Sequence, residues 1–276
     1  MTITRRTAEY VAHQATIWVG ALLLVIPFLW MISTSLKPSA EIFSPTWLPS
    51  TIEWGNYTRA LTEIPVLLYA RNTVFITILC IVGYLVSGSM VAYAFSRLRW
   101  PGRDAWFLVM LSTMMLPPQV TIVPSFVIFR QLGWINTYYP LIVPAFLSGW
   151  PFFIFLMRQF FLTIPQDLAE AAKIDGASHF MVYRTIMLPL AKPALATVAI
   201  FAFFLHWNDF FGPLIYLTED SKFTLALGLM TFAAKHQNEW SQLMAVSIVM
   251  LLPSLVVFFL CQRYFVEGIA TTGSKG

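Results

Sequence analysis

Six runs of apolar residues, each close to 20 residues long, restrict most strongly what this chain can fold into. A helix of about 20 residues is about 30 Å long, which matches the hydrocarbon thickness of a bilayer. Only 11% of the residues are charged, less than half the share that soluble domains carry. The sequence therefore predicts an all-α integral membrane protein with a single transmembrane domain over residues 1–276. The six predicted transmembrane helices are residues 17–36, 73–95, 105–126, 141–161, 194–217 and 243–261.

The first run follows a polar start with Arg5 and Arg6, as in a secretory signal peptide. It is nearly long enough to span a membrane, and the sequence Ser35-Leu36-Lys37-Pro38 after it is a poor cleavage site. We therefore expect an uncleaved first helix.

Lys and Arg side chains are concentrated on alternate segments between the runs, and this asymmetry sets the orientation of a membrane protein. The densest group is Arg97, Arg99 and Arg103, after the second run. With this segment inside the cell, both termini are predicted to be cytoplasmic. The net charge of +4 comes without any basic run of five or more residues, so the sequence does not favour nucleic acid as a partner.

No catalytic, cofactor-binding or metal-ligating group of residues stands out in the sequence. Cys80 and Cys261 lie within apolar runs, where we interpret them as small buried hydrophobic residues. The histidines are dispersed, and we expect them to be interfacial or solvated rather than metal ligands. The phosphate-binding pattern Gly-x-x-x-x-Gly-Lys-Ser/Thr is absent, so energy from ATP would have to come from another subunit. The four histidines are His13, His179, His206 and His236.

The segment between the fourth and fifth runs, residues 164–190, is polar and unusually long. A connection between two antiparallel helices needs only about two to eight residues. Pro165 suits a first helical turn, Gly176 can take the left-handed conformation that ends a helix, and Ser178 can cap a second helix. We therefore predict a cytoplasmic helical hairpin that serves as a docking surface. The apolar stripe predicted for its second helix is Phe180, Tyr183, Ile186 and Met187.

The order of residues in this hairpin resembles the EAA loop of ABC-type importer permeases. The matching residues are Glu170-Ala171-Ala172, Asp175-Gly176-Ala177, Ile186 and Leu188-Pro189. Three further stretches resemble the same family, and together they point to its carbohydrate-importer branch of the maltose-permease G-subunit type. These stretches are Trp207-Asn208-Asp209, Tyr93 to Arg97 with Pro101-Gly102, and Gly268 to Gly276.

The resemblance implies a type I ABC importer permease fold in a bacterial cytoplasmic (inner) membrane, and a permease subunit that is not itself an enzyme. It implies a second permease subunit, two cytoplasmic ATPase subunits that bind ATP and Mg, an extracytoplasmic substrate-binding protein and a sugar substrate. It also implies that the hairpin docks on an ATPase subunit, with Glu170 paired to a basic group and Gly176 at the bend. The docking residues would be Glu170, Ala171, Ala172, Asp175, Gly176 and Ala177.

Trp207, Asn208 and Asp209 are candidates for the translocation path. An acid inside a predicted span is costly unless it faces a cavity or a partner, which favours a functional role for Asp209. The alternative is that hydrogen bonds to neighbouring helix ends satisfy its carboxylate. Pro117-Pro118 in the third span has two similar interpretations, a packing kink or a break that exposes backbone groups along a polar pathway.

Two other classes of membrane protein compete with the importer permease. A self-contained secondary transporter driven by an ion gradient would carry intramembrane ionisable residues and repeat symmetry, whereas one buried acid and no convincing repeat are found. A structural anchor would leave the long hairpin unexplained. The sequence does not name the sugar, and a polyol such as glycerol phosphate is an alternative substrate.

Overall fold

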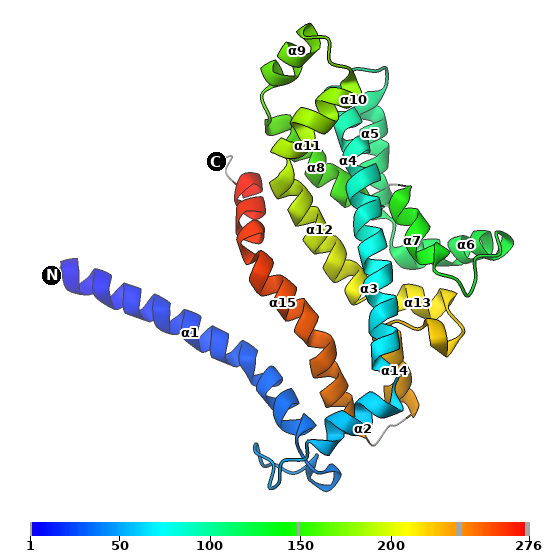
Figure 1. Cartoon of the computed structure of the whole chain (residues 1–276). Coiled ribbons are helices and arrows are strands. Elements are labelled where there is room, and N and C mark those ends of the chain that lie inside the picture. The colour runs from blue at the N-terminus through cyan, green and yellow to red at the C-terminus, as the bar shows by residue number, and fades with distance from the viewer. Residues whose placement is uncertain (1, 148–149, 236–238, 274–276) are drawn as a thin grey trace. The chain divides into compact units, whose positions relative to one another are not determined.

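The computed structural model describes residues 2–147, 150–235 and 239–273, and it describes no side chains for residues 2–8, 118 and 263–273. His236 and the side chains of the C-terminal stretch Gly268 to Gly276 therefore lie outside the described residues. All regular structure in the described ranges is helical, which confirms the predicted all-α class (Figure 1). The chain forms two compact units, residues 1–66 with 229–252 and residues 67–228 with 253–276.

The helices are long where the sequence is continuously apolar and short near the breaks. In chain order they are α1 (Thr2–Ser35), α2 (Gly55–Glu63), α3 (Val66–Gly83), α4 (Ser89–Arg97), α5 (Arg103–Ser112), α6 (Pro118–Gln131), α7 (Tyr139–Phe146), α8 (Pro151–Thr163), α9 (Gln166–Ile174), α10 (His179–Val182), α11 (Leu188–Leu190), α12 (Lys192–Trp207), α13 (Phe211–Tyr216), α14 (Leu225–Lys235) and α15 (Trp240–Gly273). Two π-helical turns, Tyr84–Gly88 and Tyr183–Met187, join α3 to α4 and α10 to α11.

Four segments are long and apolar enough to cross a membrane, and they correspond to the predicted first, second, fourth and sixth spans. Three of them are Glu9–Ser35, Val66–Arg97 and Trp240–Gln262. The fourth, Tyr139–Thr163, comprises α7 and α8 and runs over residues 148–149, which lie outside the described ranges. The third predicted span falls on a helix pair bent by 102°. The fifth overlaps only the second helix of another pair, His179–Leu190 and Lys192–Trp207, which is bent by 76° and whose first helix belongs to the segment 164–190. A count of six spans therefore requires that each bent pair be taken as one span.

The third predicted span, 105–126, is not a straight helix, because the chain turns sharply at Pro117-Pro118. A residue before proline is pushed out of the α-helical region, and Leu116 and Pro117 accordingly have ψ angles of 120° and 133°. Pro118 then begins α6, where its missing N–H is tolerated.

The prediction of one continuous helix over 194–217 is wrong. Helix α12 ends at Trp207, and Asn208 and Asp209 separate it from α13. The prediction failed because it rested on apolar composition. Phe210 and Phe211 continue that composition past the point where the backbone turns.

Helix α14 was also not predicted, since it lies where the sequence suggested an outer loop. Its buried first residues are held against α3 by polar contacts. The Asn72 amide donates to the carbonyls of Ser221 and Phe223 at 3.0 Å, and the Thr73 hydroxyl accepts from the Leu225 N–H at 2.8 Å. These contacts hold the first turn of α14 against α3.

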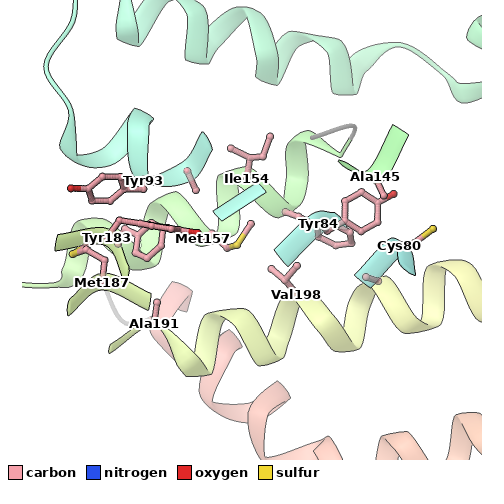
Figure 2. Close-up of a cluster of buried hydrophobic side chains, with 14 of the residues drawn as sticks. Cys80, Tyr84, Tyr93, Ala145, Ile154, Met157, Tyr183, Met187, Ala191 and Val198 are labelled. Carbon is pink, nitrogen blue, oxygen red and sulfur yellow. The ribbon is translucent and has the colours of Figure 1, made fainter. Parts of the chain in front are cut away.

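The core of the larger unit lies where α4 packs along α8, with α12 beside them. Figure 2 shows its buried side chains, with Tyr93 and Tyr183 near one end and Tyr84 and Cys80 near the other. A Cβ on Gly83 would lie 2.9 Å from the Ala145 backbone, and one on Gly88 would lie 2.9 Å from Met157. The small residues of the second span therefore serve close helix packing, as membrane helices commonly do.

The smaller unit is organised around the end of α1. Lys37 is fully buried, its ammonium donates to the Thr46 carbonyl at 2.6 Å, and it lies 4.8 Å from the ring centroid of Trp30. The Lys37 carbonyl accepts from Asn56 of α2 at 3.0 Å and from Ser241 of α15 at 2.9 Å. One residue thus ties three helices together.

Candidate functional site

The first helix of the hairpin, α9, ends in a closed backbone motif. The Gly176 N–H donates to the Lys173 carbonyl at 3.0 Å, and the Ala177 N–H donates to the Ala172 carbonyl at 2.9 Å. This is the Schellman pattern, which needs a left-handed residue, and Gly176 has φ +87°. The expected left-handed conformation of Gly176 is therefore confirmed.

The second helix of the hairpin begins as expected, since the Ser178 hydroxyl accepts from the Met181 N–H at 3.2 Å. Its predicted apolar stripe is only partly correct. Tyr183 and Met187 are buried, but Phe180 is 60% exposed and Val182 is fully buried. The π-helical turn Tyr183–Met187 widens the helix here, so a strict 3.6-residue spacing misplaces the buried face.

Two buried contacts fix the hairpin to the core. The Tyr183 and Ser89 hydroxyls are hydrogen-bonded at 2.7 Å, which joins the second helix to α4. Tyr183 also lies 5.4 Å from the ring centroid of Tyr93 (Figure 2). Ala169 of α9 is buried in the same cluster, so both helices of the hairpin rest on the core.

The predicted docking residues are divided between the two faces of the hairpin. Glu170, Ala171, Asp175 and Gly176 are exposed, whereas Ala172 and Ala177 are half-buried against the core. The Gln166 amide donates to the Glu170 carboxylate at 2.7 Å and orients it.

Sequence analysis missed Ile174, which is 87% exposed at the end of α9. Ile174 lies off the face of α9 that buries Ala169 and Ala172. An isoleucine at such a position of the helical pattern indicates an exposed apolar contact surface, so the sequence alone could have identified it. Together with the exposed Phe180, it places apolar surface next to the exposed charges of the hairpin.

Arginines close the helix ends on this side of the core. Arg97, at the end of α4, donates through Nη2 to the carbonyls of Phe161 and Ile164 at the end of α8. Arg158 donates to the Phe95 carbonyl at 3.2 Å, and its guanidinium lies 4.0 Å from the Phe107 ring centroid. These contacts satisfy carbonyl groups that a helix end leaves open.

At the break after α12, two side chains satisfy the two helix ends. The Asn208 amide donates to the Phe204 carbonyl at 3.0 Å, within the last turn of α12. The Asp209 carboxylate accepts from the Gly212 N–H at 3.1 Å, within the first turn of α13. A Cβ on Gly212 would lie 2.6 Å from an Asp209 oxygen, so the carboxylate is packed against this glycine. The geometry matches the interpretation in which helix ends satisfy Asp209.

His206 differs from its expected interfacial or solvated position. It is half-buried, its Nε2 lies 3.1 Å from the Tyr84 hydroxyl, and the two ring centroids are 5.6 Å apart. Trp207 is buried and stacks on Phe203 at 5.3 Å. The break thus carries a Tyr84–His206 pair that sequence analysis missed, because the partners lie far apart along the chain.

The family model described as a binding-protein-dependent transport system inner membrane component matches residues 84–271. The chain belongs to this family. The match includes the hairpin and the break after α12, so the resemblance found from the sequence is confirmed.

Known relatives align with this permease over nearly its whole length. The arabinooligosaccharide transport system permease protein AraQ of Halalkalibacterium halodurans is 34% identical, over 99% of each chain. The sn-glycerol-3-phosphate transport system permease protein UgpE of Rhizobium meliloti is 33% identical, over 97% of this chain and 98% of its own. A solved chain of a bacterial ABC transporter that imports the acidic polysaccharide alginate has a TM-score of 0.82 and 26% identity, over 92% of this chain and 95% of its own.

These likenesses confirm the permease fold and a multi-pass location in an inner membrane. They place the chain among permease subunits rather than enzymes, and they do not favour the self-contained secondary transporter.

Proposed function

We propose that this permease translocates a sugar or a related polyol by alternating access, driven by ATP hydrolysis in partner subunits. The observation that carries the proposal is the hairpin of residues 164–190, closed by Gly176 and fixed to the core by Tyr183, in a chain of the binding-protein-dependent family. The substrate class is supported by relatives whose names specify arabinooligosaccharides and sn-glycerol 3-phosphate.

The hairpin is the proposed contact with a cytoplasmic ATPase subunit. Glu170 would pair with a basic group of that subunit, and the exposed Ile174 and Phe180 would supply the apolar part of the contact. The backbone of Gly176 and Ala177 sets the angle between the two helices, while Ala171 and Asp175 lie on the exposed side. A rigid hairpin of this kind can transmit a rotation of the partner to the spans.

Asn208 and Asp209 are proposed to brace the translocation path rather than to hold the substrate. Their polar groups are engaged by the ends of α12 and α13, which supports a structural role. Trp207 is buried beside them and would stiffen the same break.

The complete transporter is proposed to contain a second permease, two ATPase subunits with ATP and Mg, and an extracytoplasmic binding protein. No residue within the apolar window of α1 is buried within the chain. A long exposed apolar helix of this kind is suited to contact with lipid or with a second permease subunit.

The proposal is tested by reconstituting the complex in proteoliposomes and measuring ATP hydrolysis with each candidate substrate bound to its binding protein. We expect Ile174→Asp to reduce co-purification of the ATPase subunits, because it puts a charge in the apolar part of the contact. Leu61→Asp, the same change at a half-exposed site on α2, is the matched control and should have no effect. Uptake that follows an imposed ion gradient, without any associated ATPase, would instead establish a secondary transporter.

A further inference from the structure

The arginine-rich end of the larger unit contains a basic cleft whose ligand the proposed function does not supply. Its volume is about 220 Å³, and its walls come from the end of α4, the turn before α5 and one face of α9. Four cationic side chains and one carboxylate line it. They are Arg97, Arg99, Arg103, Lys173 and Glu170.

Two of the cations are available to an anion. Arg99 and Lys173 are exposed and make no side-chain hydrogen bond or ion pair within the part of the chain that the structure describes. Arg103 is already held by Asp104 at 2.9 Å and by the Leu98 carbonyl at 3.3 Å. The cleft therefore has fixed positive charge on its walls and free donors at its mouth.

The basic cleft and an apolar groove adjoin the same middle cavity. This middle cavity, of about 380 Å³, shares Arg99 and Arg103 with the cleft, and it shares Trp100 with the groove. The groove has a volume of about 460 Å³ and contains no charged side chain. It is lined by Phe95, Trp100, Trp106, Val109 and Met110. The middle cavity is also lined by the Asp104 carboxylate, which is paired with Arg103. An occupant would therefore pass from cationic surroundings, beside this ion pair, to aromatic and aliphatic surroundings.

The position of the cleft in the chain corresponds to a membrane–water interface. One candidate span, Val66–Arg97, ends at its edge, and the next candidate segment begins at Arg103. Tryptophan is enriched at this depth because its ring is apolar and its N–H is polar. Basic pockets between membrane helices are known to bind acidic lipid headgroups.

We propose that this site binds an anionic phospholipid, with its phosphodiester between Arg99 and Lys173 and an acyl chain in the groove at Trp106. Guanidinium and ammonium groups are the usual partners of phosphate oxygens. A free phosphate would leave the groove empty, and an acidic peptide would bring backbone amides into a groove that has no polar side chains except the indole N–H groups. The lipid satisfies both parts of the site and links α9 of the hairpin to the bilayer.

The test measures retention of dioleoyl phosphatidylglycerol and dioleoyl phosphatidylcholine on the purified full-length permease by native mass spectrometry. We expect preferential retention of phosphatidylglycerol and about a 30-fold loss of that affinity in Arg99→Gln/Lys173→Gln, the value for two interfacial charges. Arg130→Gln/Arg184→Gln removes the same charge from exposed positions outside the cleft and should retain the lipid. Equal losses in both variants would show general charge attraction and overturn the site.

Two further measurements separate the lipid from its headgroup. Trp106→Ala should weaken dioleoyl but not dihexanoyl phosphatidylglycerol, whereas Trp18→Ala, at a similarly exposed tryptophan of α1, should change neither. Inorganic phosphate should not displace the dioleoyl lipid at matched concentration. If inorganic phosphate displaces the lipid, or if Trp106→Ala has no effect, the site recognises only an anion, and the proposal is overturned. Because lipid retention needs no ATPase subunit, failure of the transport function would not affect this result.

Discussion

The hairpin after α8 and the break after α12 interrupt the helices of the same compact unit, but they satisfy their backbone groups differently. At the hairpin the main chain closes on itself, through the N–H groups of Gly176 and Ala177. At the break two side chains do this work, because Asn208 and Asp209 each bond a helix end. The difference teaches that the end of α9 is closed without the exposed side chains of Ile174 and Asp175, whereas the polar side chains of the break are already occupied.

The largest effect is expected from Gly176→Val, which disfavours the left-handed backbone that closes the hairpin. A left-handed conformation costs an L-residue about 1–2 kcal/mol, which is about a 5- to 30-fold loss of the closed hairpin. No atom lies within 4 Å of the added Cβ, so we attribute the expected effect to the backbone conformation rather than to a clash of the Cβ. We expect substrate-stimulated ATP hydrolysis to fall accordingly while membrane insertion is unchanged.

Gly176→Asn is the matched control, because asparagine accepts the left-handed region. It should keep most of the coupling. If valine and asparagine behave alike, the closure of the hairpin does not depend on the main-chain conformation.

A smaller effect is expected from Gly212→Ala at the break. The new Cβ would lie 2.6 Å from an Asp209 oxygen and 2.9 Å from Leu141, and overpacking of this kind costs about 1–3 kcal/mol. The midpoint of thermal unfolding in detergent should fall. Gly20→Ala, where no atom lies within 4 Å, should not lower it.

Transport measured on the same variant tests what Asp209 does. If Asp209 holds the substrate rather than the helix ends, Gly212→Ala should alter substrate selection without loss of stability. That outcome would remove the contrast between the hairpin and the break.

The smallest effect concerns the loop that follows α13. Asn136, at φ 60° in the connection between α6 and α7, binds this loop. Its side-chain oxygen accepts from the N–H groups of Thr218 and Glu219, and its amide donates to the Glu219 carboxylate at 2.6 Å. Lys222 at 3.0 Å, together with Asn136, holds the pKa of Glu219 below its usual range.

A carboxyl group with a lowered pKa stabilises the folded state above its ordinary pKa of about 4.3, and this contribution is lost as pH falls through the lowered value. Hydrogen exchange at the Thr218 and Glu219 amides should therefore speed up in acid relative to the Glu219→Gln variant. Glu63→Gln, at an exposed acid of α2, should leave this acid response unchanged. An identical acid response in Glu219→Gln would assign it to another group.

The hairpin was predictable because local rules determine it. Pro165, Gly176 and Ser178 each act within a few residues of their own position, so their order in the sequence specifies two helices and the turn. The buried face was predicted less well, since the π-helical turn Tyr183–Met187 shifts the periodicity.

The break was not predictable from composition. A hydrophobic window cannot distinguish a straight span from two helices joined at Asn208 and Asp209, because the flanking residues are equally apolar. The Tyr84–His206 pair depends on how the π-helical turn Tyr84–Gly88 and α12 approach each other, which only tertiary packing determines. The same is true of α14, whose docking depends on Asn72 and Thr73 of a distant helix.

The two π-helical turns are positions where the chain can lose one residue without a change in the helices on either side. An α-helix rotates by about 100° for each residue, so an insertion inside a packed α-helix would turn every later side chain away from its contact. A π-helical turn accommodates one additional residue locally. A relative that lacks one residue within Tyr84–Gly88 could form an ordinary α turn there and still present the same faces of α3 and α4 to α8 and α12. Single-residue gaps in this family are therefore expected to be tolerated at these two turns and rejected in the helices beside them.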